Sequence, residues 1–305
     1  VSQEYAIVHA PLSGVLPLSF TQHTYSAIPK LYGLQDTTAL EAAGILPVFS
    51  QPNLMSTGQG VLIGLIDTGI DYTNPLFQNP DGTSRILRLW DQTMEREASP
   101  EPVAGFQPFY GTVYSQEDLS RALDSENPFE LVPSTDTNGH GTFLAGVAAG
   151  RQIQSPTTFS GAAPDAALAV VRLKPAKQYL REFFAIPADA DAYQENDIMT
   201  AAAFLLGVAG QYRLPLVLLL GVGTAQGSHS GISPLAMQLQ ALSGTRGFAC
   251  VTGAGNEAGF RHHYPGRLSP DQAYEDVELR VADSTAGFSM ELWADVSELY
   301  AVGFV

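Results

Sequence analysis

The feature that most constrains the fold is a continuous apolar run at 61–66, Val-Leu-Ile-Gly-Leu-Ile, which ends at Asp67-Thr68-Gly69. Such a run, with its β-branched residues, is typical of a strand that is buried on both faces, as in parallel sheets. A carboxylate directly after the strand lies at the carboxyl edge of the sheet, where α/β folds build their sites. Asp67 is therefore a candidate site residue, although Asp-Thr-Gly is also a good turn sequence.

Strand-like and helical segments alternate along the chain after this run. Apolar residues recur at helical spacing in two stretches, and in a third Ser233 and Pro234 have the residue types of an N-cap and a first helical position. The predicted helices cover 141–150, 196–212 and 233–242, and the further predicted strands cover 214–220 and 248–253. This alternation predicts an α/β sandwich with helices packed on a mostly parallel sheet.

Two long polar intervals, 74–135 and 172–195, interrupt the alternation. Long loops in a compact domain usually have a function, and we expect these two to flank a substrate cleft. After residue 270 apolar and polar residues alternate in short runs, which indicates antiparallel strands. The apolar members of these runs are Val277, Leu279, Val281, Phe288, Met290, Leu292, Tyr300, Val302 and Phe304.

The charge balance narrows the partners that we expect. The chain has 15 basic and 31 acidic residues and a net charge of −16, which argues against nucleic acid or an anionic membrane as a partner. No apolar run approaches the roughly 18–20 residues that a membrane-spanning helix needs. The single cysteine, Cys250, excludes an intrachain disulfide and is predicted to be a buried strand residue rather than a nucleophile.

His140 lies between two glycines at the predicted start of the helix at 141–150. A helix N-terminus disfavours a protonated imidazole and so keeps a base neutral. His262 and His263 are adjacent, and adjacent residues of a strand face opposite ways, so we interpret them as loop or surface residues rather than a metal pair. His229 is predicted to lie in a loop.

The segments 61–71, 138–142 (Asn-Gly-His-Gly-Thr) and 254–257 (Ala-Gly-Asn-Glu) resemble, in this order, the motifs of the subtilisin-like serine peptidases, or subtilases. The resemblance implies peptide-bond hydrolysis by an Asp-His-Ser triad. Asp67 would orient the base, His140 would be the base, and Asn256 would donate its amide to the oxyanion. It also implies a strand that binds an extended peptide by β-augmentation. The substrate-binding residues that it implies are Leu220, Gly221, Val222, Gly223, Ala254 and Gly255.

The serine that would complete the triad is missing. Gly82-Thr83-Ser84 matches three letters of the family motif, but it precedes His140 in the chain and lacks the small residues that follow the motif, so we predict a hairpin turn. Ser233 precedes Asn256 and is the predicted N-cap. We expect a serine, if the protein has one, beyond Val305.

The resemblance also implies how the chain is divided into domains. Residues 1–35 resemble the C-terminal part of a subtilase propeptide, whose tail stays in the active-site cleft. Counting back from Asp67 places the start of the mature enzyme near the Gln35–Asp36 bond, where we expect autoprocessing; an uncut N-terminal extension is the alternative. Residues 36–270 would be the catalytic domain, and 271–305 the start of an inserted β domain whose remainder lies outside this chain.

Among subtilases, the chain resembles the clostridial Csp-like germination proteases, on the residues 42–45, 227–229, 255–257 and 261–264. In that family a jelly-roll domain is inserted between the oxyanion Asn and the Ser, and the proteins are bacterial, secreted or spore-associated. Some members have lost triad residues and act in regulation. An active endopeptidase and an inactive pseudoprotease therefore both remain open.

For an active enzyme the expected partners are a protein or peptide substrate, such as a pro-enzyme, and its own propeptide. No cofactor is required. Structural calcium is common in the family, although no loop here has convincing ligand spacing.

Overall fold

The computed structural model describes residues 56–95, 106–153 and 159–255, most of 262–304, Val103, and a few residues before 56, among them strand β1 (Leu31–Leu34). Its centre is a six-stranded sheet in the order β4-β3-β5-β2-β7-β9. The strands are β2 (Leu62–Asp67), β3 (Ile86–Asp91), β4 (Thr112–Ser115), β5 (Ala167–Arg172), β7 (Leu216–Leu220) and β9 (Phe248–Thr252). Every neighbouring pair is parallel except β3 and β4, so the predicted mostly parallel sheet is confirmed.

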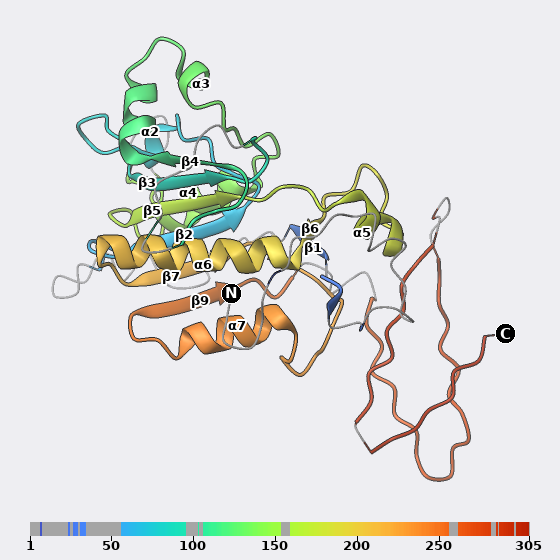
Figure 1. Cartoon of the computed structure of the whole chain (residues 1–305). Coiled ribbons are helices and arrows are strands. Elements are labelled where there is room, and N and C mark those ends of the chain that lie inside the picture. The colour runs from blue at the N-terminus through green and yellow to red at the C-terminus, as the bar shows by residue number, and fades with distance from the viewer. Residues whose placement is uncertain are drawn as a thin grey trace.

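Strand β2 lies near the middle of this sheet and supplies side chains to two cores. Leu62 and Ile66 pack in one core together with Leu205, and Ile63 and Leu65 pack in the other together with Leu144. Helices therefore cover both faces, which gives the predicted three-layer sandwich (Figure 1). The helices that do so are α2 (Gln116–Leu123), α4 (His140–Ala149), α6 (Glu195–Tyr212) and α7 (Pro234–Ser243).

The predicted helices form for the expected reasons. The apolar stripe of α6 is fully buried against the sheet; its members are Ile198, Ala201, Ala202, Leu205 and Val208. In α7 the Ser233 side chain accepts a hydrogen bond from the amide of Ala236, and Pro234 is the first helical residue. The hydrogen bond and the position of the proline are the N-cap and the helix start that the sequence predicts.

The interval 74–135 is more than the polar loop expected from its composition. It contains β3, which is buried and parallel to β5, together with β4, α2, the short helix α3 (Pro128–Leu131) and the 3-10 turn η3 (Pro75–Phe77). Arg88 and Asp91 interrupt the apolar run of β3 and conceal the strand in the sequence. Asp91 is nevertheless buried, because it accepts hydrogen bonds from Arg172 and Ser134. The turn at 82–84 is confirmed by the antiparallel bridge between Gln78 and Ser84.

A second, small sheet lies beside the sandwich. It has the order β6-β1-β8 and is antiparallel throughout. β6 (Tyr193–Gln194) comes from the interval 172–195, which also contains helix α5 (Gln178–Phe183), and β8 (Val222–Gly223) follows β7 after a single residue, Gly221. The segment at the N-terminal end of the chain thus lies between two segments that are far from it in the sequence.

The antiparallel strands expected after residue 270 are not formed in the described part of 262–304. This segment extends away from the sandwich (Figure 1). Val277, Leu279 and Val281, the apolar side of one alternating run, are all close to half exposed. A strand is stabilised by its neighbour, and these runs find none among the described residues. The start of an inserted β domain therefore stays a prediction.

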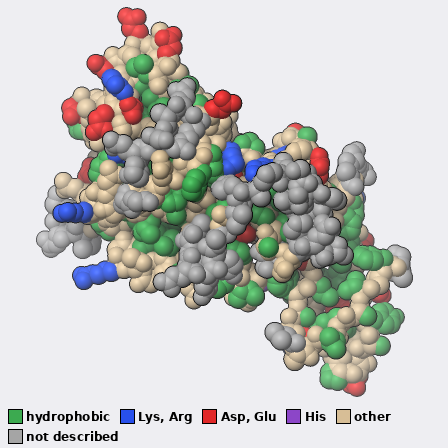
Figure 2. All heavy atoms as spheres, in the orientation of Figure 1, with side chains coloured by type: hydrophobic (Ala, Val, Ile, Leu, Met, Phe, Trp, Pro, Cys, Tyr) green, Lys and Arg blue, Asp and Glu red, His purple; other side chains and the backbone are tan. Residues whose placement is uncertain are grey.

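The acidic surplus lies partly on the polar surface of α2 and α3, where acidic side chains gather in Figure 2. The acidic residues between 116 and 131 are Glu117, Asp118, Asp124, Glu126 and Glu130. Within the described part of the chain, no helix combines the length and apolar character needed to cross a membrane.

Candidate active site

Asp67 is the last residue of β2 and lies at the carboxyl edge of the sheet. Its side chain is fully buried, with Oδ1 2.7 Å from the amide nitrogen of Thr68 and 2.8 Å from Nδ1 of His140. A carboxylate oxygen only accepts hydrogen bonds, so Nδ1 of the histidine carries the hydrogen. In the neutral ring the second nitrogen, Nε2, then holds the lone pair. The structure therefore brings together the two residues that the sequence predicts as orienting carboxylate and base.

His140 is the first residue of α4, and the preceding Gly139 adopts a left-handed conformation with φ of 88°. Such a conformation favours glycine and turns the chain sharply into the helix. The His140 side chain is 11% exposed, so its ring lies at the surface of the site rather than within the core. On the other side of the turn, the side-chain amide of Asn138 donates to Asp191 at 3.0 Å.

Two glycines allow the close approach of the elements that carry Asp67 and His140. A Cβ atom on Gly221 would lie 2.2 Å from Oδ2 of Asp67, and a Cβ atom on Gly141 would lie 2.2 Å from the backbone oxygen of Gly69. No real Cβ contact is that short. The residue after β7 and the second residue of α4 therefore have to be glycine for β2, α4 and β7 to meet at this edge.

Replacing Gly141 with alanine is expected to lower the free energy of unfolding by about 1–3 kcal/mol, the usual cost of overpacking. The clashing atom is a backbone oxygen, which cannot swing away as a side chain can. The matched control is Gly146→Ala on the same helix, where the nearest atom would be 3.9 Å away. Alanine there should be neutral or stabilising by up to about 1 kcal/mol. Denaturant unfolding followed by circular dichroism measures both, and equal effects from the two changes would contradict this account.

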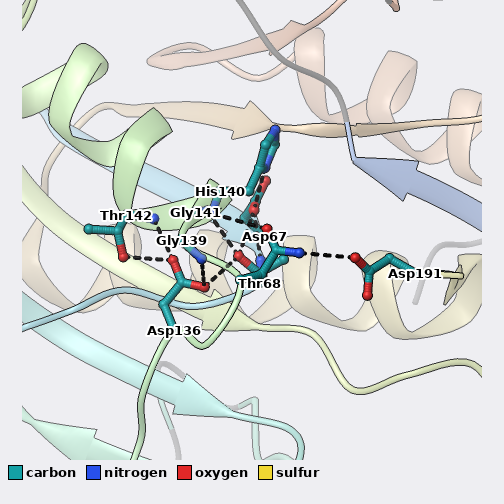
Figure 3. A network of polar contacts seen from close by, with 9 residues as sticks. Asp67, Thr68, Asp136, Gly139, His140, Gly141, Thr142 and Asp191 are labelled. Atoms are coloured by element: carbon teal, nitrogen blue, oxygen red, sulfur yellow. Dashed lines mark hydrogen bonds and ion pairs between the residues drawn. The ribbon is translucent and has the colours of Figure 1, made fainter. Parts of the chain in front are cut away.

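A second carboxylate, Asp136, holds the loops on either side of the pair (Figure 3). Its Oδ1 accepts hydrogen bonds from the Thr68 hydroxyl at 2.8 Å and from the Gly139 amide at 2.9 Å. Its Oδ2 accepts from the amide of Thr142 at 2.8 Å and from the hydroxyl of Thr142 at 2.6 Å. Asp136 could not be singled out from the sequence, because it lies five positions before the predicted helix at 141–150, outside the N-cap and first-turn positions where capping carboxylates usually stand.

The predicted substrate-binding strand is divided between two elements. Leu220 ends β7 and is buried, Gly221 packs on Asp67, and Val222 and Gly223 form β8. β8 pairs with β1 in the register Gly33 to Gly223 and Leu34 to Val222. The chain's own N-terminal segment therefore occupies the edge where an extended peptide was expected.

The remaining predicted site residues lie partly outside the described residues. Ala254 and Gly255 follow β9, and Gly255 has a positive φ of 85°. Asn256 lies outside the described residues, as do Gln35 and Asp36.

Neither serine considered from the sequence is placed to serve His140. Ser84 lies two residues before the start of β3, at the amino edge of the parallel sheet, whereas Asp67 lies at the carboxyl edge. The Ser84 side chain is buried and accepts a hydrogen bond from the amide of Ile86. Ser233 is occupied as the N-cap of α7.

The single cysteine and the histidines other than His140 that the sequence raised as candidates have no catalytic or metal-binding surroundings among the described residues. Cys250 lies in strand β9 as predicted but is only partly buried rather than buried. That burial still raises the pKa of its thiol, which disfavours the thiolate that a nucleophile needs. His262 and His263 are exposed in a loop, as predicted, and the His263 ring lies 5.7 Å from that of His229. Within the described ranges, no group of three or more His, Cys, Asp or Glu side chains could hold a metal ion.

Comparison with known proteins identifies a family. The family model described as the subtilase family matches residues 58–278. The subtilisin-like protease SBT1.9 of Arabidopsis thaliana is 31% identical over 157 residues, which cover 47% of this chain and 19% of that protein. The structure of the CspB protease of Clostridium perfringens matches with a TM-score of 0.56 and 30% identity, over 70% of this chain and 39% of that one. The chain thus spans about a fifth of the length of the first relative and about two fifths of the second.

Proposed function

This chain belongs to the subtilase family, and from that premise we propose that it carries the base and the orienting carboxylate of a serine endopeptidase. The observation that supports the proposal most is the hydrogen bond of 2.8 Å between Nδ1 of His140 and the buried Oδ1 of Asp67. A serine peptidase needs a neutral imidazole that a carboxylate holds in the right tautomer and orientation. The proposed substrates are proteins or peptides, bound in an extended conformation.

In the proposed reaction, Nε2 of His140 takes the proton of a serine hydroxyl while the serine oxygen attacks the carbonyl carbon of the peptide bond. The carbonyl oxygen becomes an oxyanion, to which we assign the side-chain amide of Asn256 as a donor. His140 then gives its proton to the leaving amine as the C–N bond breaks and an acyl-enzyme forms. A water molecule repeats the cycle and releases the acid. Throughout, Asp67 stabilises the imidazolium.

We place the nucleophilic serine outside the 305 residues of this chain. The serine that matches the family's tripeptide, Ser84, precedes a strand at the opposite edge of the sheet from Asp67. In the subtilase order the serine also follows the oxyanion Asn, and here that means a position after Asn256. A serine after Val305 is consistent with the position of Ser84 and with the order of the family motifs.

We further propose that residues 1–35 are the end of a propeptide that blocks the site until it is cleaved. The support is the small sheet, in which β1 pairs antiparallel with β6 on one side and with β8 on the other. β8 follows Gly221, which touches Asp67, so a peptide paired with β8 runs past the Asp67–His140 pair. β-augmentation of this kind binds any extended peptide through its main chain.

Processing is expected at or near the Gln35–Asp36 bond, which directly follows β1. In active full-length protein, mass spectrometry of the N-terminus should find Asp36 as the new first residue, and His140→Ala should remain uncut. An active protein with an intact bond would show that 1–35 is a permanent extension. Cleavage that persists in His140→Ala would assign the cut to another protease.

The proposed function is tested by incubating the full-length gene product with an unfolded protein such as reduced casein. We expect hydrolysis that a sulfonyl fluoride inhibitor abolishes and a metal chelator leaves unchanged. Binding of casein or a peptide without hydrolysis, in processed and folded protein, would instead support the alternative, a pseudoprotease that acts in regulation or binding.

A further inference from the structure

Asp136 lies in the loop before His140 and connects this loop to the loop after Asp67. Through the hydroxyl of Thr68 it reaches the residue next to Asp67, and through the amide of Gly139 it reaches the residue before His140. Its contacts with Thr142 reach the first turn of α4. One carboxylate thus fixes the loop before His140 and the start of α4, which are close to it in sequence, and ties them to Thr68, which only the fold brings near (Figure 3).

The backbone on both sides of His140 is held by this network. The amide of Gly139 donates to Asp136, and the amide of Gly141 donates to the hydroxyl oxygen of Thr68 at 2.9 Å. The hydroxyl oxygen of Thr142 also accepts a hydrogen bond from the amide of Asp71 at 2.9 Å, which ties the start of α4 to the segment after β2. His140 therefore has little freedom to move relative to β2.

The Thr68 hydroxyl lies within hydrogen-bond reach of both Asp67 and Asp136. Its oxygen is 2.8 Å from Oδ1 of Asp136 and 3.2 Å from Oδ1 of Asp67. A hydroxyl has one hydrogen to donate, and the shorter distance assigns it to Asp136. Oδ1 of Asp67 is thereby left to the Thr68 amide and to Nδ1 of His140.

We propose that Asp136 is a positioning residue for the Asp67–His140 pair. It holds the two loops at the separation that the pair needs, and it keeps the Thr68 hydroxyl proton away from the oxygen that accepts from His140. Its importance for catalysis rests on the proposed function, whereas its effect on the pair does not.

The ionisation of Asp136 agrees with this role. Burial acts to raise its pKa, but the hydrogen bonds from Thr142, Gly139 and Thr68 outweigh burial, so the pKa of Asp136 is lowered. The side chain is therefore a carboxylate at neutral pH and can accept all four hydrogen bonds. An asparagine at 136 keeps one oxygen and replaces the other with a donor, so either Thr142 or the pair of Thr68 and Gly139 loses its acceptor.

The test is nuclear magnetic resonance of the histidine-labelled protein, which reports the Nδ1–H proton that His140 shares with Asp67. His140→Ala identifies this resonance by its loss. In Asp136→Asn we expect it to move upfield or to broaden through faster exchange with water. The amide cannot hold both loops, and where its oxygen faces Thr142 the Thr68 hydroxyl turns to Oδ1 of Asp67. Thr142→Val removes one of the four hydrogen bonds to Asp136 together with the one from the Asp71 amide, and it should change the resonance in the same direction. Thr142→Ser keeps the hydroxyl and should leave the resonance as in the unchanged protein.

The matched control is Asp118→Asn. Asp118 is also a capping carboxylate with a lowered pKa, and it accepts from the amide and the hydroxyl of Ser115 at the start of α2. Both changes should lower the unfolding midpoint, but only Asp136→Asn should change the His140 resonance. An unchanged resonance in Asp136→Asn, or an equal change in Asp118→Asn, would overturn the proposal. If Asp136→Asn does not fold, the two Thr142 variants decide in the same way.

Reaction with an active-site probe separates this inference from the proposed function. If the full-length protein is an active peptidase, Asp136→Asn should slow labelling by a fluorophosphonate, by up to about 10²-fold. If no variant is labelled while the resonance still responds to Asp136→Asn, the proposed function fails and the positioning role stands.

Discussion

Replacing His140 with alanine is expected to reduce kcat for peptide hydrolysis by about 10⁶-fold, the size of the loss in subtilisin itself, a member of this family. The reason is that the serine hydroxyl would lose the base that takes its proton, while Asp67 would keep a buried negative charge without the imidazole. KM should change little, because the peptide is held by main-chain pairing rather than by this ring. Steady-state hydrolysis of a fluorogenic peptide by the full-length protein measures both constants.

The matched control for this change is His229→Ala. His229 is an exposed loop residue whose ring packs on those of His263 and Trp293. It should retain kcat within a small factor. A comparable loss in both variants, or a His140→Ala variant that keeps more than a small fraction of the activity, would contradict the assignment of the base.

The second large effect is expected for Asp67→Asn, with a loss in kcat of about 10⁴-fold, as for the corresponding change in serine peptidases. The amide has the shape of the carboxylate but no charge, so it cannot stabilise the imidazolium. Its nitrogen is also a donor, and a donor facing the ring favours the tautomer that leaves Nε2 protonated and unable to act as a base. The fold should be retained, since the volume is unchanged.

Asp81→Asn is the control for Asp67→Asn. Asp81 closes an exposed turn by accepting from the amide and the hydroxyl of Thr83. Loss of its charge should leave kcat unchanged. If Asp67→Asn kept wild-type activity with a normal circular dichroism spectrum, Asp67 would not be the orienting carboxylate.

The parts of the fold that were predictable are those in which local chemistry and tertiary environment agree. The apolar run that became β2 is buried on both faces, and the stripe on α6 faces the sheet as its periodicity indicates. Asp67 and His140 lie 73 positions apart in the sequence, yet two motifs in the family order were enough to predict that they meet.

Strand β3 was not predictable because its polar residues are satisfied by distant partners. Asp91 would disfavour a buried strand in isolation, and only the fold brings Arg172 and Ser134 to it. Asp136 was missed for the same reason: its role depends on Thr68, which is remote in sequence. Local sequence patterns predict the helices, the strands and the motifs. Buried polar networks join residues that are remote in sequence, so they can be seen only in the folded chain.

The measurement that tests the central claim most directly is labelling of the full-length gene product with a fluorophosphonate probe, followed by mass mapping of the labelled peptide. The account predicts a label on a serine outside residues 1–305, and none in His140→Ala. No labelling of folded and processed protein, or a label on a serine within this chain, would contradict it.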